Sequence, residues 1–174
     1  ERQAEYFQLK SADSRAVLQR ERHGTLFADV ERQLDLYLRA LWRDSDTLVP
    51  YSTAFDEIRK PIPYYDKLGL RVPDVFDDAQ GVAGLDRYRA VLAHMIGHRR
   101  WSKPQIADNW SPFQRMAVEF FEDCRIENLL IREYPGLRRI FLALHPKPVE
   151  NACDPETTSC LRHRLAILSR ALID

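Results

Sequence analysis

The chain has 174 residues, of which 45% are hydrophobic and 30% charged, as expected for a folded domain and not for a disordered chain. Twenty-six basic residues balance 26 acidic ones, so the net charge is zero, which argues against a nucleic-acid or anionic-membrane surface. No apolar run approaches the roughly 20 residues that span a bilayer, so no transmembrane segment is expected. Three cysteines do not make a disulfide framework, which predicts a reducing, cytoplasmic location.

The basic residues are strongly skewed, with 21 Arg against 5 Lys. Because Arg forms bidentate, partly buried ion pairs and is common at protein interfaces, we expect many structured charge contacts. The length fits a single domain covering residues 1–174. The chain begins without Met and ends directly behind an apolar helix, so we expect it to be a fragment of a larger protein.

Helical periodicity dominates most of the chain. Residues 4–22 are polar but are expected to be helical as far as His23-Gly24. The later predicted helices each carry an apolar stripe at helical spacing; they are Thr25–Asp44, Leu85–Trp101, Pro112–Glu133, Gly136–Leu144 and Ser159–Ile173. No segment reads convincingly as a strand, so the sequence predicts an all-α fold of about five to six helices.

The segment from about residue 45 to 83 differs in character. Four prolines and two glycines interrupt any long helix there, and Tyr and Phe residues supply apolar anchors. We expect a long ordered loop, with short helical or extended pieces, wrapped over the helical core. A loop of this length is uncommon in a compact domain and is usually functional or poorly ordered.

The predicted helix Pro112–Glu133 carries charges at the edge of its apolar stripe. Its start is marked by a capping box between Ser111 and Gln114. A helical wheel centres the stripe on Phe113, Ala117, Phe120, Cys124 and Ile131, with acidic residues on its flank. Desolvating a carboxylate is costly unless it gains a partner. We therefore expect a structural ion-pair network made by Glu122, Asp123, Arg125, Glu127 and Arg87, or alternatively a pair of oxygen ligands or an acid/base pair.

Two histidines, His94 and His98, are spaced i, i+4 on the predicted helix Leu85–Trp101. This spacing suits zinc, as in the HExxH helix of metalloproteases. In that motif a glutamate follows the first histidine as general base, and here the position is Met95. One interpretation is two packed histidines bonded to carboxylates of the neighbouring helix. The other interpretation is a metal ion, with zinc as the candidate, bound by His94, His98 and one carboxylate. Asp123 and Glu127 are the carboxylates we predict, and Glu122 is a further candidate.

A second set of residue types suited to zinc is His145, Cys153, Cys160 and His163. Their spacings fit no standard zinc finger, so packed thiols and a solvent-facing His163 are the competing interpretation.

No sequence motif indicates phosphate binding or a serine nucleophile. The six glycines are scattered and form no phosphate-binding loop, and no G-x-S-x-G sequence is present.

Several segments together resemble the helical region that precedes the von Willebrand A (VWA) domain in NorD- and CbbO-type proteins. They are GLDRYRAVLAHMIGHRRW (Gly84–Trp101), Ala107–Pro148 and SCLRHRLAILSRA (Ser159–Ala171). The most specific parts are an E-D-x-R-[IV]-E element at Glu122–Glu127 and the Tyr-Pro-Gly-Leu-Arg-Arg run at Tyr134–Arg139. The likeness covers the second half of the chain well and the GTLFADVERQLDLYLRALW stretch less securely.

The resemblance implies a partner of MoxR-type AAA+ ATPases that helps to activate or remodel a target enzyme, nitric oxide reductase for NorD and Rubisco for CbbO. The D-x-S-x-S motif of a VWA metal-dependent adhesion site is absent from this chain, so the chain's own VWA domain would lie outside it. We therefore expect a non-catalytic adaptor that is not an enzyme and needs no cofactor. The alternative is a zincin-like helical metal-binding domain, a degenerate metallohydrolase.

Overall fold

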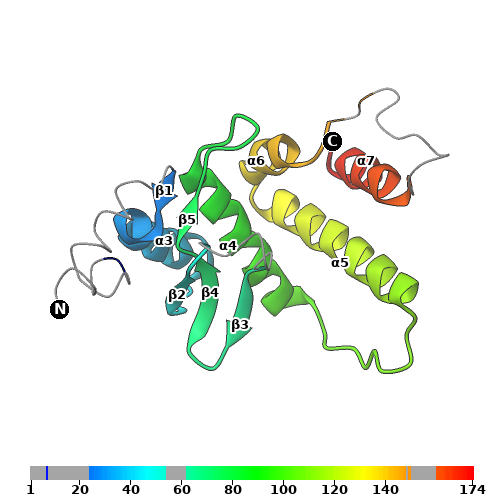
Figure 1. Cartoon of the computed structure of the whole chain (residues 1–174), viewed down its shortest axis with the longest axis horizontal. Helices are drawn as coiled ribbons and strands as arrows, with labels where there is room; N and C mark the ends of the chain where they lie inside the picture. Colours follow the sequence, from blue (N-terminus) through cyan, green and yellow to red (C-terminus); the bar gives the residue numbers. More distant parts are fainter. Residues whose placement is uncertain (1–6, 8–23, 54–61, 148, 150–159) are drawn as a thin grey trace.

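The computed structural model describes residues 7, 24–53, 62–147, 149 and 160–174. The predicted helix 4–22 lies outside these residues, apart from residue 7. In chain order the elements are β1 (Thr25–Leu26), α3 (Phe27–Trp42), β2 (Leu48–Tyr51), β3 (Tyr64–Asp66), β4 (Gly69–Pro73), β5 (Val75–Phe76), α4 (Gly84–Trp101), α5 (Pro112–Glu133), α6 (Leu137–Leu144) and α7 (Leu161–Ile173). The helices α3 and α4 and the strands form one end of the molecule, and α5, α6 and α7 form the other (Figure 1).

The all-α prediction is wrong, because two small sheets make the fold mixed α/β. One sheet has the order β2-β4-β3, with β2 parallel and β3 antiparallel to β4, and the other pairs β1 with β5. Apart from β1, the strands lie in the segment that the sequence predicts as a long loop. They are only two to five residues long, and most pairings join residues distant in sequence, so local periodicity does not reveal them.

The hydrophobic core lies where α3, α4 and the three-stranded sheet meet, and α5 extends it. Its fully buried members include Leu34, Leu38, Leu70, Val72, Tyr88, Leu92, Ile96, Ile126 and Leu130. Tyr88 of α4 donates a hydrogen bond from its hydroxyl to the Pro73 carbonyl oxygen at 2.8 Å. This bond satisfies the buried hydroxyl and fixes α4 against the end of β4.

The bounds and the capping box of α5 are confirmed. The Ser111 hydroxyl accepts from the Gln114 amide, and the Gln114 side chain accepts from the Ser111 amide. The predicted apolar centre of the helix is wrong in part, because Phe113 is 61% exposed. The buried face instead contains Cys124, Ile126, Glu127 and Leu130.

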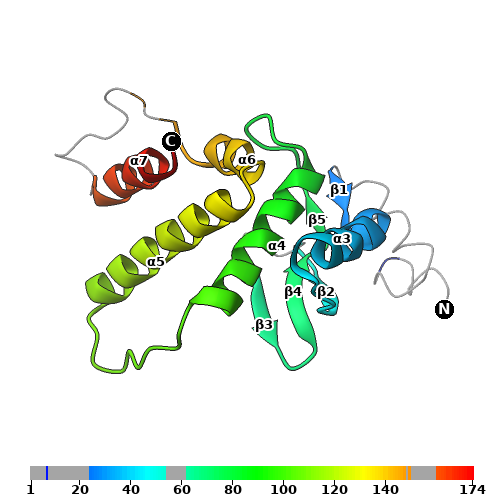
Figure 2. The same cartoon turned by 180° about the vertical axis from the view of Figure 1, so that it is seen from behind.

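A glycine in α4 lets α5 approach closely. A Cβ built on Gly97 would lie 2.5 Å from Ile126 Cγ2, nearer than real Cβ contacts, and 3.2 Å from Leu130 Cδ1, which is tighter than most of them. Gly97 lies between His94 and His98 in sequence, so the close crossing occurs where the two imidazoles leave the helix. From this crossing the two helices diverge toward the start of α5 (Figures 1 and 2).

Candidate functional site

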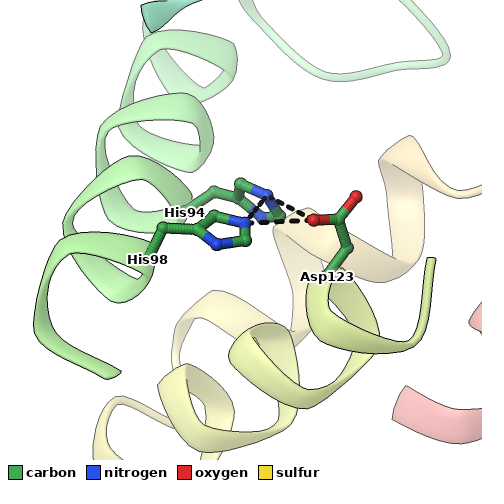
Figure 3. A group of neighbouring side chains, drawn as sticks. All are labelled: His94, His98 and Asp123. Carbon is green, nitrogen blue, oxygen red and sulfur yellow. Dashed lines mark hydrogen bonds and ion pairs between the residues drawn. The ribbon is translucent and has the colours of Figure 1, made fainter. Parts of the chain in front are cut away.

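Two histidines of α4 and one aspartate of α5 converge on a single point (Figure 3). His98 Nε2 lies 3.0 Å from His94 Nε2 and 3.0 Å from Asp123 Oδ1. His94 Nε2 lies 3.5 Å from the same Asp123 oxygen. The i, i+4 spacing puts both imidazoles on one face of α4, and the close approach at Gly97 brings Asp123 to them.

A series of hydrogen bonds fixes the His98 ring at Nδ1, the nitrogen that faces away from Asp123. His98 Nδ1 is 2.9 Å from the Ser102 hydroxyl, and this hydroxyl donates to Glu122 Oε1 at 2.5 Å. Arg125 donates to both Glu122 oxygens at 2.6 and 2.7 Å and also to the Trp101 carbonyl oxygen at 2.8 Å. The ion pair between Glu122 and Arg125 therefore orients His98 through a serine.

Glu127 is the buried carboxylate of the network, with a relative exposure of 9%. Its Oε2 accepts from His145 Nε2 at 2.7 Å, and its Oε1 faces His94 Nδ1 at 3.7 Å. His145 Nδ1 lies 2.9 Å from the Ser169 hydroxyl, which itself donates to the Ala166 carbonyl oxygen. One glutamate thus connects α4, α5, the end of α6 and α7.

The electrostatics follow from these partners. Burial lowers the pKa of His94, but hydrogen bonds to Asp123 and Glu127 outweigh it and raise the pKa to about 9. Burial raises the pKa of Asp123 and of Glu127, and their histidine partners outweigh this effect, so both pKa values lie below normal. The hydrogen bonds from Arg125 lower the pKa of Glu122 to about 2. All three carboxylates are therefore ionised at neutral pH.

The structure brings together most of the residues that the sequence singles out. His94, His98, Asp123 and Glu127 form one cluster, and Glu122 pairs with Arg125 beside it. Arg87 is not part of this network, because it donates to the Asp77 carbonyl oxygen and lies over the Phe76 ring.

Sequence reasoning missed Ser102 and Ser169 and assigned His145 to another site. A serine four residues after His98 is a signal that helical spacing could have provided. The predicted set of His145, Cys153, Cys160 and His163 is not assembled among the described residues. His145 faces Glu127, Cys160 is disulfide-bonded, and Cys153 lies outside the described residues.

Three hollows among the described residues border the cluster, and the smallest, of about 420 Å³, lies between α5 and α7 against Asp123, Glu127 and His145. A cavity of about 730 Å³ is lined by both histidines, Asp123, Glu127 and Glu119, together with apolar residues of α4, α6 and α7. A groove of about 850 Å³ lies on the other side of Asp123, between α5 and the loop that follows α4. Trp101, Trp110, Val118 and Phe121 line it. The cluster is thus reachable from solvent.

The cluster has the residue types of a metal site but lacks one part of a metalloprotease. The residue after His94, where such an enzyme carries its general base, is Met95. Comparison with known proteins does not supply a function, because no family model, curated protein or solved structure matches the chain. Within the described part of the chain, no helix combines the length and apolar character needed to cross a membrane.

Proposed function

We propose that this chain is a non-catalytic adaptor module of a NorD/CbbO-like protein that docks a MoxR-type AAA+ ATPase. In this role it helps the ATPase to activate or remodel a target enzyme such as nitric oxide reductase or Rubisco. One observation carries the docking role. The first half of α5 exposes Phe113, Val118 and Phe121 to 61%, 42% and 57%.

Phe113 lies at the exposed start of α5, and the other two side chains line the groove described above. Val118 and Phe121 line the groove with the two tryptophans, Trp101 and Trp110, that flank the loop between α4 and α5. This part of α5 points away from α4 (Figure 2). Exposed apolar patches rimmed by polar residues mark protein interaction sites, and aromatic anchors dominate the energy of such interfaces. The groove therefore fits an apolar segment of the ATPase better than a small polar ligand.

The polar cluster beside the groove supports a structural role. Asp123 and Glu127 have histidine partners, and Glu122 has Arg125 and Ser102. Met95 stands where a metallohydrolase has its general base. Since hydrolysis by a metal-activated water needs a proton acceptor, we assign no reaction to the cluster.

A binding experiment on the full-length protein tests this function. We expect the Phe113→Ser/Phe121→Ser variant to lose capture of the cognate MoxR-type ATPase, while Leu36→Ser retains it. Leu36 is a matched control, because it is a 56% exposed leucine on α3, at the other end of the molecule. Equal capture by both variants would remove the groove from the proposal. Failure of the wild-type protein to bind its ATPase would contradict the adaptor function itself.

A further inference from the structure

The cluster at the crossing of α4 and α5 brings three possible metal-ligand atoms, one from each of His94, His98 and Asp123, to within 3.5 Å of one another. We propose that His94, His98 and Asp123 bind a divalent first-row transition metal ion, zinc foremost, which clasps α4 to α5. This inference does not rest on the adaptor function: His98 and Asp123 line the groove as well, but the docking role depends on the exposed apolar side chains and not on the three ligands.

The distances between the three donor atoms suit such an ion. They are 3.0, 3.0 and 3.5 Å. Zinc binds histidine nitrogen and carboxylate oxygen at about 2.0–2.2 Å, and tetrahedral angles then separate two ligands by roughly 3.3–3.5 Å. An ion can therefore sit between the three atoms after shifts of a few tenths of an ångström.

The hydrogen bonds behind His98 direct a lone pair into the cluster. The Ser102 hydroxyl gives its proton to Glu122, so it accepts the proton of His98 Nδ1. The Nε2 atom of His98 is thereby the ring nitrogen that faces the cluster, 3.0 Å from Asp123 Oδ1 and 3.0 Å from His94 Nε2. In the metal-free protein the ion pair of His94 with Asp123 holds these atoms together. A metal ion that displaces the proton of this pair is held by all three donor atoms at once.

Both histidines also have the supporting partners typical of metal ligands. Ligating histidines usually present their second ring nitrogen to a carboxylate or another acceptor, which fixes the ring and its tautomer. Glu127 stands behind His94 Nδ1, and Ser102 stands behind His98 Nδ1. His145 holds Glu127 in place, and Arg125 holds Glu122. These supports come from α5, from the residue after α4 and from the residue after α6, so the ion would act on the packing of all three helices.

The choice of ion follows from the donor set and from access. Two imidazoles and one carboxylate suit zinc and also iron(II), and zinc binds more tightly than iron(II) at a given site of this type. Three protein ligands leave a further position, which opens into the cavity of about 730 Å³. A water molecule would occupy this fourth coordination position. With Met95 in place of the base, the ion holds the helices together and no hydrolytic step is assigned to it.

Metal analysis of the chain, purified without chelator and then incubated with zinc and desalted, tests the site. We expect about one zinc per chain, and we expect cobalt(II) to give the intense visible bands of a tetrahedral nitrogen–oxygen site. Less than about a tenth of an ion per chain would overturn the proposal. A stoichiometric iron content in the purified protein would keep the site and overturn the choice of zinc.

Variants distinguish the site from adventitious binding. We expect His98→Ala and Asp123→Ala to abolish zinc retention, and Ser102→Ala to weaken it by about 10- to 100-fold as a supporting residue. His163→Gln is the matched control, since it removes a half-buried histidine of α7 outside the cluster, and it should bind like the wild type. Retention by His98→Ala, or equal loss by His163→Gln, would overturn the assignment.

Thermal unfolding gives a readout that separates ion binding from simple misfolding. An ion that binds only the folded state raises the unfolding temperature. We expect zinc to raise it in the wild type and in His163→Gln but not in Asp123→Asn, which keeps the side-chain shape. If the alanine variants do not fold, the comparison of Asp123→Asn with wild type still decides. An equal rise in all three proteins would mean that zinc binds elsewhere.

Discussion

The two halves of α5 differ in a way that runs against the usual division between apolar interior and polar surface. The C-terminal half buries Glu127 beside Ile126 and Leu130, where it crosses α4. The N-terminal half leaves Phe113 and Phe121 more than half exposed. The carboxylate is inside because His145 and His94 compensate its desolvation. The phenylalanines are outside because no described element covers them.

This difference separates architecture from recognition within a single helix. A buried, fully partnered charge is costly to disturb and fixes the angle between the helices, whereas an exposed aromatic contributes little to folding. Substitutions in the C-terminal half should therefore reduce stability, and substitutions in the N-terminal half should reduce partner binding.

The largest effect is expected at Glu127. We expect Glu127→Ala to lower the free energy of unfolding by about 3–5 kcal/mol, because it leaves the His145 imidazole buried without its partner. Chemical denaturation of the metal-free protein measures this. Glu119→Ala is the matched control two helical turns earlier on α5, where the glutamate is exposed, and it should change stability by less than about 0.5 kcal/mol. Equal effects of the two variants would erase the contrast between the halves.

A smaller effect is expected from pH. The pKa of His94 is raised from 6.5 to about 9 in the folded protein, so its protonated form stabilises the metal-free fold. This stabilisation is fully present below pH 6.5 and is lost as the pH rises through about 9. We expect a loss of no more than roughly 3 kcal/mol over that range. Denaturation in chelator at several pH values should show it, and His94→Gln should flatten the profile. Constant wild-type stability would contradict the pairing of His94.

The next effect concerns the close helix crossing. We expect Gly97→Val to destabilise the protein by about 1–3 kcal/mol, because the added side chain must displace Ile126 and Leu130. Gly136→Ala serves as control, because a Cβ there meets nothing within 4 Å. The Gly97 variant should also lose zinc binding, since it separates Asp123 from the two histidines. Unchanged thermal stability of Gly97→Val would show that the helices can move apart without cost.

The helix bounds were predictable because caps and prolines act locally. The sequence places the ends of α5 at Pro112 and Glu133 as the structure does, owing to the Ser111 capping box and the Pro135 break. The strands were not predictable in this way. The pairing of Leu48 with Leu70 joins short segments more than 20 residues apart, and its stability depends on tertiary contacts that local patterns do not contain.

The candidate site was predictable in part for the same reason. The i, i+4 spacing of His94 and His98 indicates that both lie on one face of a helix. The charges beside Cys124, at the edge of the apolar stripe, indicate carboxylates with ion-pair or hydrogen-bond partners. The apolar centre of α5 was misjudged, because a helical wheel cannot show that the helix end carrying Phe113 projects beyond its neighbours (Figure 1). The role of His145 was also hidden, since only the turn after α6 brings it to Glu127.

The smallest stability effect is expected at Phe121. We expect Phe121→Ser to change the free energy of unfolding by less than about 0.5 kcal/mol, because more than half of the ring already contacts water. The same variant should lower capture of the ATPase, so a normal denaturation curve together with lost binding is the outcome that locates recognition on this half of α5. A stability loss comparable to that of Glu127→Ala would mean that the ring contributes to folding, and it would contradict the division of α5 into a structural half and a recognition half.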